Sequence, residues 1–342
     1  MRVFVYEYLT ALGVGRDPAD PLHPLHREGR AMSDAAASDF GRITGVVVVT
    51  LGDAGPGGER EAFRDAVRRC EWALVIAPEF DGILAERCGW VERDGGRLLG
   101  PAAGAVAFAG DKLLTAERWR RCGVSTPATT DRELTGCEAF PVVWKPRDGA
   151  GSAATFLLQD ALDLARAKAL RAADGHAGPM ILQEFVPGRA ASVAFLCGPA
   201  GCFPLLPCLQ LLSDDGRFKY LGGELPVPPH LAERAVRLGR RAVGCVPGLC
   251  GYVGVDLVLG GAADGSEDYA IEINPRLTTS YVGLRALAEF NIAEAMLRVA
   301  AGDPAGELRW KPGPVRFLPD GTVRPVSQGY HTGPGAGAPP RI

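Results

Sequence analysis

The sequence predicts an α/β protein with an amino-terminal doubly wound parallel sheet and two α+β units after it. Two observations carry this prediction. In the first hundred residues, short apolar runs alternate with segments of helical periodicity, which is typical of a parallel sheet covered by helices on both faces. Beyond Thr126, two or three strand-like segments stand between successive amphipathic helices. A chain of 342 residues is long enough for two or three domains.

The first unit follows from its apolar pattern. Val46–Leu51 is continuously apolar, which suits a buried parallel strand. Asp111–Cys122 has helical spacing and is stopped by Gly123. The other segments are strands at Arg2–Leu9 and Trp72–Ala77 and helices at Glu28–Phe40 and Glu59–Glu71.

The remaining units contain more strands than helices. We expect strands at Phe140–Pro146, Ala154–Leu158, Met180–Val186, Ala191–Cys197, Cys202–Leu211, Tyr252–Leu259 and Tyr269–Ile273. Helices are expected at Asp160–Ala173, His230–Gly244 and Leu284–Ala301, with a Gly/Pro-marked excursion at Leu221–Pro229. These segments divide the chain into domains at 1–110, 111–188 and 189–330, and a flexible tail at 331–342 that has nothing to bury.

Composition excludes several classes of protein. Hydrophobic residues make up 47% and charged residues 23%, as in globular proteins. A formal net charge of −3 with interspersed signs argues against nucleic acid as a partner. No apolar run approaches the roughly 20 residues that span a bilayer. We therefore expect a cytoplasmic protein that binds neither nucleic acid nor membrane.

The nine cysteines are scattered, and none forms a C-x-x-C pair. Cys197, Cys202 and Cys208 cluster, but no histidine stands near them to complete a zinc site. Mostly buried thiols in a reducing cytosol are the expectation.

A glycine turn after an apolar strand is the first candidate for chemistry. The strand ends at Lys145, and Asp148, Gly149, Gly151 and Ser152 follow at once. Backbone N–H groups in such a turn can converge on phosphate oxygens while the lysine adds a positive charge. The Walker pattern is absent because the lysine precedes the glycines. An ordinary hairpin turn with an exposed lysine explains the segment equally well.

Three oxygen-bearing side chains form the second candidate. Glu272 and Asn274 lie two apart in a strand and share a face, and Asp256 stands in the preceding strand. If the two strands pair, the three side chains offer the hard oxygen ligands that Mg²⁺ takes. The alternative is a solvated sheet face, but the apolar neighbours suggest burial, and buried acids need a cation.

Further candidates flank these two. Arg276 follows the second strand and can hold a phosphoryl or carboxylate group with two hydrogen bonds. The hydroxyl run Thr278, Thr279 and Ser280 behind it could equally cap the next helix. The strand end Gln183, Glu184, Phe185 and Val186 could read adenine with its backbone, and Lys112 could reach phosphates from a helix start.

In chain order these pieces resemble the ATP-grasp superfamily of carboxylate–amine ligases. The matching motifs are Asp-Lys at 111–112, Val-x-Lys-Pro with its glycine loop at 143–151, Gln-Glu-Phe-Val-Pro-Gly at 183–188, Gly-Val-Asp-Leu at 254–257 and Ile-Glu-Ile-Asn-Pro-Arg at 271–276. Within the superfamily, the segments 4–8, 145–152, 220–223 and 273–280 are similar to the tyramine–glutamate ligase family of methanofuran biosynthesis. The resemblance implies an ATP-grasp fold, in which two α+β subdomains, one of them a lid, grip ATP.

The resemblance also assigns roles. Lys112 and Lys145 would bind phosphates under a mobile loop at Asp148–Ser152, and Glu184 and Val186 would meet adenine with Phe185 packed on it. Asp256, Glu272 and Asn274 would bind one or two Mg²⁺ ions, for which Mn²⁺ could substitute. Arg276 and Lys145 would be catalytic. The ribose contact stays open, because 188–192 lacks the glutamate that many members place there.

The expected activity is ligation of a carboxylate, glutamate, to an amine such as tyramine through an acyl phosphate, with release of ADP and phosphate. The substrates would contact Glu7, Tyr220, Gly222, Gly223, Arg276, Thr278, Thr279 and Ser280. Glu7 is also a candidate general base, although it could simply be a polar residue at a sheet edge. Alternatives are another amino-acid or peptide ligase of the superfamily, a small-molecule kinase or a non-catalytic ATP sensor. Dimerisation is common in the superfamily and is expected here.

Overall fold

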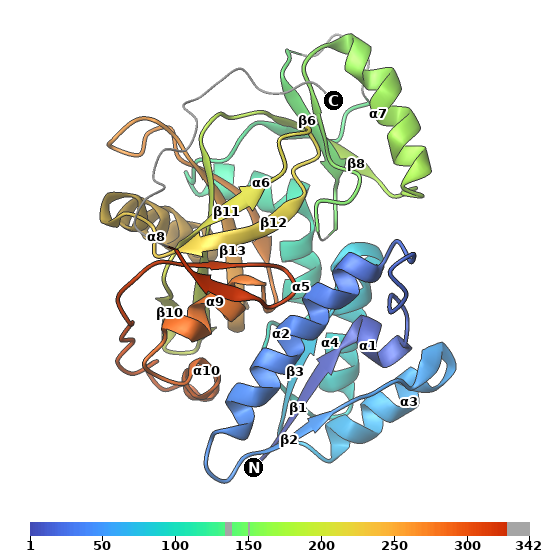
Figure 1. Cartoon of the computed structure of the whole chain (residues 1–342), viewed down its shortest axis with the longest axis vertical. Coiled ribbons are helices and arrows are strands. Elements are labelled where there is room, and N and C mark those ends of the chain that lie inside the picture. The colour runs from blue at the N-terminus through green and yellow to red at the C-terminus, as the bar shows by residue number, and fades with distance from the viewer. Residues whose placement is uncertain (134–138, 150, 327–342) are drawn as a thin grey trace.

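The computed structural model describes residues 1–133, 139–149 and 151–326, and these contain three β-sheets (Figure 1). The first sheet is wholly parallel with the order β2-β1-β3-β4. Its strands are β1 (Arg2–Glu7), β2 (Val47–Thr50), β3 (Trp72–Ile76) and β4 (Arg97–Leu98). The parallel sheet predicted for this part of the chain is confirmed.

Helices cover both faces of this sheet. α2 (His23–Gly41) packs on one face, where Met32 and Phe40 meet Val3 and Val5. On the other face Phe63 contacts Phe4 and Tyr6 edge to face. The other helices around the sheet are α1 (Tyr8–Leu12), α3 (Gly55–Arg68), α4 (Ile83–Arg93) and α5 (Ala103–Gly110), whereas α6 (Lys112–Arg121) contacts β5 (Thr129–Thr130) and β14 (Tyr269–Asn274) of the other two sheets.

The burial expected for Val46–Leu51 is wrong. This segment forms β2, which lies at the edge of the sheet, and Val47 is 56% exposed. A run of β-branched residues reports strand propensity, but it does not distinguish an edge position from a central one.

The second sheet is antiparallel with the order β5-β8-β6-β7. α7 (Ala161–Ala173) packs on it through a small core that includes Trp144 and Phe156. Its strands are β5 (Thr129–Thr130), β6 (Val142–Pro146), β7 (Phe156–Leu158) and β8 (Met180–Glu184).

The largest sheet is antiparallel with the order β14-β13-β9-β11-β12-β15-β16, and β10 pairs with β9. α8 (Pro229–Gly244) covers one face, and α9 (Ser280–Leu287) and α10 (Ile292–Ala301) cover the other. The strands are β9 (Arg189–Gly198), β10 (Gly201–Pro204), β11 (Cys208–Leu212), β12 (Tyr220–Leu225), β13 (Gly251–Leu259), β14 (Tyr269–Asn274), β15 (Val315–Phe317) and β16 (Val323–Pro325). Division of the chain into domains at 110 and 188 stays a prediction.

Three expectations for this sheet are wrong. The strand expected at Cys202–Leu211 is split into β10 and β11 on either side of Leu205–Pro207. The excursion at Leu221–Pro229 contains most of β12. The helix expected at Leu284–Ala301 is α9 and α10, because the chain leaves the helix after Leu287 and Asn291 caps the next one with its side chain.

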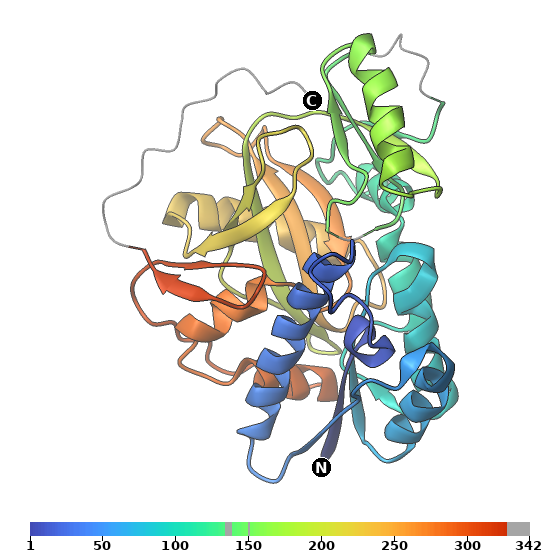
Figure 2. The same ribbon diagram turned by 45° about the vertical axis from the view of Figure 1, so that its right-hand side comes forward.

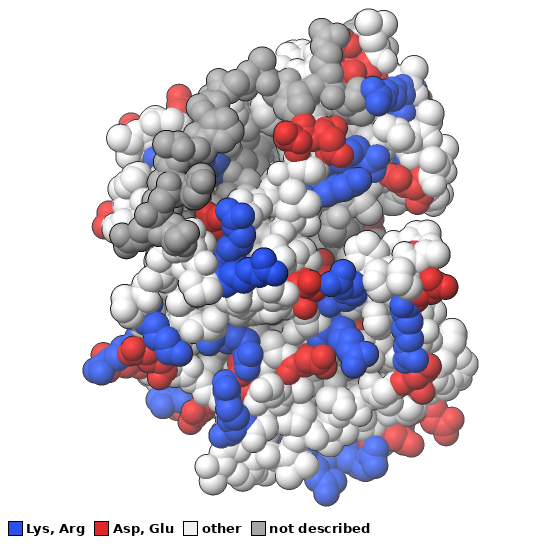
Figure 3. All heavy atoms as spheres, in the orientation of Figure 1, with Lys and Arg blue, Asp and Glu red and all other residues white. Residues whose placement is uncertain are grey.

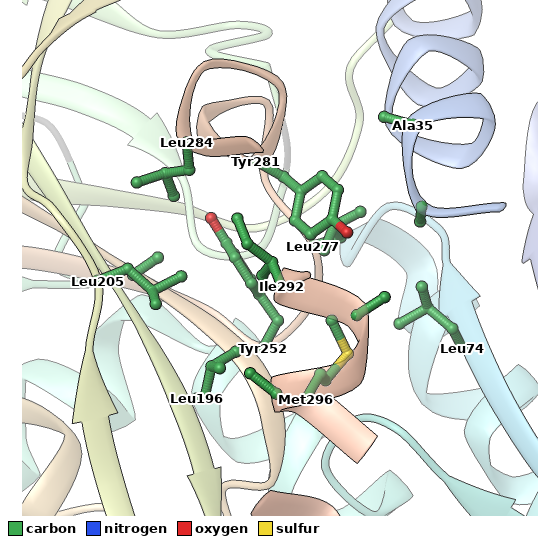
Figure 4. Close-up of a cluster of buried hydrophobic side chains, with 14 of the residues drawn as sticks. Ala35, Leu74, Leu196, Leu205, Tyr252, Leu277, Tyr281, Leu284, Ile292 and Met296 are labelled. Atoms are coloured by element: carbon green, nitrogen blue, oxygen red, sulfur yellow. The ribbon is translucent and has the colours of Figure 1, made fainter. Parts of the chain in front are cut away.

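A shared core joins the first sheet to the largest one. Helices α9 and α10 contact α2, and both ribbon views show this arrangement (Figure 2). Leu74 and Ala35 from the amino-terminal side pack in one cluster with Tyr281 and Met296 (Figure 4). Beside the cluster, buried Asp39 of α2 accepts a hydrogen bond from the Tyr281 hydroxyl at 2.7 Å.

The cysteine expectation is partly wrong. Cys202 lies opposite Cys197 in the β9–β10 hairpin, and the two form a disulfide. Cys88 and Cys208 are buried thiols, but Cys122 is exposed. Cys137 and the tail 331–342 lie outside the described residues.

The surface carries mixed charge. In the view of Figure 3, basic and acidic side chains are interspersed. Among the helices of the described ranges, none is both long and apolar enough to cross a bilayer.

Candidate active site

A cavity of about 950 Å³ brings most of the expected site residues together. All three sheets or the loops next to them contribute to its walls. Expected residues that line it are Lys112, Lys145, Asp148, Gly149, Gly151, Ser152, Gln183, Glu184, Phe185, Val186, Tyr220, Asp256, Glu272, Asn274, Arg276, Thr278, Thr279 and Ser280.

The hairpin of β13 and β14 places the three oxygen-bearing side chains together, as predicted. Asp256 lies directly opposite Glu272 in the register, and Asn274 lies opposite Gly254. The Asn274 amide donates to Asp256 at 3.2 Å, and the Gln210 amide donates to the other Asp256 oxygen at 3.0 Å. The strand pairing therefore creates one oxygen-rich surface.

Two lysines face this surface. Lys112 is the first residue of α6, which Asp111 caps, and its Nζ lies 3.5 Å from Glu272 and 3.4 Å from the Gly149 carbonyl oxygen. Lys145 comes from β6 and is buried. Burial lowers the pKa of Lys145 to about 8, although Glu272 opposes that shift.

The two acids differ in their titration. Burial, and then the charge of Glu272, raises the pKa of Asp256 to about 7. Burial would also raise the pKa of Glu272, but Lys112 and Lys145 outweigh it and hold that pKa below its ordinary value. Two partly buried carboxylates that face each other favour a cation between them.

The donor set fits a hard divalent cation. In the described part of the chain, no three carboxylate, imidazole or thiol groups converge, so the donors are the two carboxylates and the Asn274 amide. Mg²⁺ commonly takes one or two carboxylates and fills its other positions with water and phosphate oxygens. Asp256, Glu272 and Asn274 match that pattern.

Two acids of the amino-terminal part reach this region, and the sequence analysis missed both. Glu79 pairs with Arg276 through two contacts, Nε to Oε1 at 2.9 Å and Nη2 to Oε2 at 3.1 Å. Glu28 of α2 accepts a hydrogen bond from the Thr279 hydroxyl and lines the cavity. No local motif surrounds either acid, because their partners lie far along the chain.

The hydroxyl run beyond Arg276 makes contacts within the protein. The Tyr252 hydroxyl lies 2.8 Å from the Ser280 oxygen and 3.2 Å from the Thr278 oxygen. Thr279 stands at the start of α9, but no side-chain hydrogen bond caps that helix. The capping alternative is therefore wrong, and the hydroxyls face the cavity and its supporting residues.

The other end of the cavity is apolar and offers strand backbone. Phe185 lies beside Phe218, with ring centroids 6.5 Å apart. Gln183 is less available than expected, because its amide donates to the Thr129 hydroxyl at 3.0 Å. Phe218 was not foreseen, since it lies in a Gly- and Asp-rich segment without strand periodicity.

The glycine turn has the backbone that its sequence suggests. Gly149 and Gly151 have φ of +150° and +69°, and Ser152 also has a positive φ of +57°. Asp148 accepts a hydrogen bond from the Asp81 N–H at 3.2 Å, which links the turn to the amino-terminal part. Residue 150 lies outside the described ranges.

Three expected substrate residues do not line the cavity. Glu7 is buried and caps α1 by accepting from the N–H groups of Leu9 and Thr10. Gly222 and Gly223 lie against β15, where a Cβ would come 2.2 Å from the Phe317 carbonyl oxygen and 2.5 Å from its ring, respectively. These two glycines permit close strand packing, and Glu7 serves a helix.

Comparisons with known proteins show the family to which the chain belongs. A family model described as an ATP-grasp domain matches residues 109–280, and one described as a pre ATP-grasp 3 domain matches 37–106. Tyramine–L-glutamate ligase of Methanocaldococcus fervens is 31% identical over 232 residues, which cover 68% of this chain and 67% of that protein.

Solved structures share the fold at lower identity. An ATP-grasp superfamily protein from Archaeoglobus fulgidus aligns with a TM-score of 0.69 and 24% identity, covering 92% of both chains. A biotin carboxylase from Campylobacter jejuni in a βγ-ATP complex gives 0.65 and 16%, covering 92% of this chain and 75% of that one.

The ATP-grasp match spans half of the chain, so the protein belongs to the ATP-grasp family. It is an ATP-dependent carboxylate–amine ligase of that family. More particularly, it resembles tyramine–L-glutamate ligase.

Proposed function

We propose that the protein joins a carboxylate of L-glutamate to a primary amine of the tyramine type and converts ATP to ADP and phosphate. The name of the archaeal relatives supports this substrate pair. The observation that carries the proposal is the pairing of Asp256 with Glu272 in β13 and β14, with Lys112 only 3.5 Å from Glu272.

The reaction has two steps in this proposal. A carboxylate oxygen of the first substrate attacks the γ-phosphorus of ATP, and ADP leaves. The amine nitrogen then attacks the carbonyl carbon of the acyl phosphate and loses a proton, and phosphate leaves with the bonding electrons. No covalent enzyme nucleophile is needed, so positioning and charge supply the rate enhancement.

The expected site residues in the cavity divide into those that bind phosphate, carboxylate, metal and adenine. Lys112 and Lys145 bind phosphate oxygens, and Arg276 holds the carboxylate or the transferred phosphoryl group. Asp256, Glu272 and Asn274 would hold one or two Mg²⁺ ions, which neutralise phosphate charge when bound. Asp148, Gly149, Gly151 and Ser152 cover the phosphates, while Glu184, Val186 and Phe185 contact adenine.

Product analysis tests the proposal. The protein is incubated with MgATP, L-glutamate and tyramine, and with each substrate omitted, and the products are identified by mass spectrometry. ADP, phosphate and an amide that appear only with all three substrates are expected. Release of AMP and pyrophosphate would exclude the acyl-phosphate route, and amide formation only with another amine would refute tyramine as substrate.

A further inference from the structure

Glu28 is an acid in the cavity wall that forms no ion pair with any residue the structure describes. Within the described ranges, no Lys, Arg or His nitrogen lies within 4.0 Å of its carboxylate, and the Thr279 hydroxyl is its hydrogen-bond donor. Burial raises the pKa of Glu28, and the Thr279 hydrogen bond and the charge of Arg276 oppose that shift. A desolvated carboxylate beside an open cavity favours a cationic ligand.

The other acids of the cavity wall are already accounted for. Asp256 and Glu272 face the two lysines, and Asp174 pairs with Arg217. Asp148 accepts a backbone N–H, and Asp81 and Glu184 are exposed to solvent. Among the described acids of the cavity wall, Glu28 is therefore the one for which a cationic ligand would supply the missing ion pair.

Apolar side chains stand next to this acid. Leu25 precedes Glu28 by three residues on α2, so the two are neighbours on the helix, and Leu22 is the N-cap residue just before the helix. The two leucines and Phe80 line the same cavity as Glu28. One end of the wall is thus negative, and the adjoining part is apolar.

This wall adjoins the group that would hold the activated carboxylate. Thr279, which donates to Glu28, follows Arg276 by three residues, and the charge of Arg276 acts on Glu28. A ligand whose nitrogen rests on Glu28 is therefore brought to the region where the acyl phosphate would form.

We propose that Glu28 receives the ammonium group of the amine substrate, while Leu22, Leu25 and Phe80 contact its apolar body. The subsite would select primary amines that have an aromatic or aliphatic body. This inference rests on the proposed function. L-Glutamate also has an ammonium group, but its short chain with two carboxylates does not match an apolar wall.

The test separates activation of the carboxylate from use of the amine. Wild-type protein and Glu28→Gln are assayed with MgATP and L-glutamate, first with hydroxylamine, which traps an acyl phosphate as a hydroxamate and is uncharged at neutral pH. The second assay uses tyramine. The variant should raise KM for tyramine about 10- to 100-fold, the value of a lost charged hydrogen bond, and change hydroxamate formation less than about threefold.

Asp34→Asn is the matched control. Asp34 lies on the same helix, is exposed and lies 3.5 Å from Arg30, so its removal should leave both reactions unchanged. An increase in KM for L-glutamate, an equal loss in both reactions or no loss in either would overturn the assignment of Glu28.

A direct binding measurement tests the amine subsite independently of the proposed reaction. Tyramine and 4-ethylphenol, which has the same aromatic body without the nitrogen, are titrated into both proteins and followed by calorimetry. Glu28→Gln should weaken tyramine binding and leave 4-ethylphenol binding unchanged. If the wild-type protein forms no hydroxamate but shows this pattern, the proposed reaction fails and the amine subsite stands. Equal binding of tyramine by both proteins would refute the subsite.

Discussion

Glu79 and Arg276 lie 197 residues apart in the chain and form a two-point ion pair at the wall of the cavity. Glu79 follows the central part of the parallel sheet, whereas Arg276 follows β14 of the largest sheet. Arg276 also donates to the Leu277 carbonyl oxygen at 3.1 Å. These contacts hold the guanidinium in place, so a residue of the amino-terminal part sets the orientation of the Arg276 side chain.

Replacing Glu79 tests this positioning. Glu79→Gln removes the countercharge and lets the guanidinium shift, and a displacement of about 1 Å can cost roughly 100-fold in rate. We expect kcat to fall by about that factor in steady-state assays of ADP release. Glu307→Gln is the control, because Glu307 is 70% exposed and pairs with Arg309 at the surface. A kcat within twofold of wild type for Glu79→Gln would contradict the role.

Lys145→Ala should abolish measurable ADP release while circular dichroism shows an intact fold. The side chain is buried in the wall of the cavity, where we propose that it binds phosphate, and loss of one preorganised charge costs about 100- to 1000-fold in kcat. Lys168→Ala, an exposed lysine on α7, should retain wild-type activity. Near-full activity of Lys145→Ala would remove this lysine from the mechanism.

Nucleotide binding should depend on pH through the same lysine. Because its pKa is about 8 in the free protein, Lys145 is increasingly neutral above that pH, and triphosphate binding favours its charged form. ATP affinity at saturating Mg²⁺ is therefore highest below about pH 8 and falls above it, and binding takes up a proton there. Calorimetry in buffers of different ionisation enthalpy measures this uptake, and Lys145→Met should abolish it. Release of a proton when ATP binds the wild-type protein, instead of uptake, would contradict this role of Lys145.

Metal dependence should follow the two paired acids. Chelation of divalent cations should stop ADP release, and added Mg²⁺ should restore it. Glu272→Gln removes one carboxylate from the facing pair, so we expect a large increase in the Mg²⁺ concentration for half-maximal activity. Glu267→Gln, in the loop before β14, is the control. An unchanged Mg²⁺ requirement in Glu272→Gln would place the metal elsewhere.

Asp39 should matter for stability rather than for chemistry. It is 1% exposed and accepts from Tyr281 at 2.7 Å and from Arg285 at 2.6 Å. Asp39→Ala leaves Arg42, Arg285 and the buried Tyr281 hydroxyl without this partner, which costs about 1–3 kcal/mol in free energy of unfolding. Urea denaturation measures the change. Asp65→Ala, at an exposed pair with Arg68, should cost about 1 kcal/mol or less, and equal losses would deny Asp39 a special role.

Local patterns in the sequence were enough to predict that Asp256, Glu272 and Asn274 lie together and that Lys145 ends a strand. Glu272 and Asn274 share a face through the two-residue period of a strand, and Asp256 joins them as soon as the two strands pair. Lys145 stands at a strand end directly before the glycine turn. Only one pairing had to be assumed, and it is the pairing that the structure has.

The part of the cavity around Glu28 could not be predicted in the same way. Glu28 meets Thr279 across 251 residues, and no periodicity or motif encodes that contact. Gly222 and Gly223 were misassigned because a glycine pair near a loop suggests a ligand, whereas β15 packs against them. The break between α9 and α10 did carry a signal, the N-cap residue Asn291, within an otherwise helical pattern.

The joint core of α2, α9 and α10 has a practical consequence for protein engineering. A fragment cut at residue 109 would retain Lys112, Lys145 and the β13–β14 hairpin, but it would lose Glu28 and Glu79 and expose Tyr281 and Met296 to water. Such a fragment would be prone to aggregate. A chimera in which a relative's segment replaces residues 1–108 should instead take on the amine preference of that relative. The grafted segment must contain an acid that pairs with Arg285, as Asp39 does.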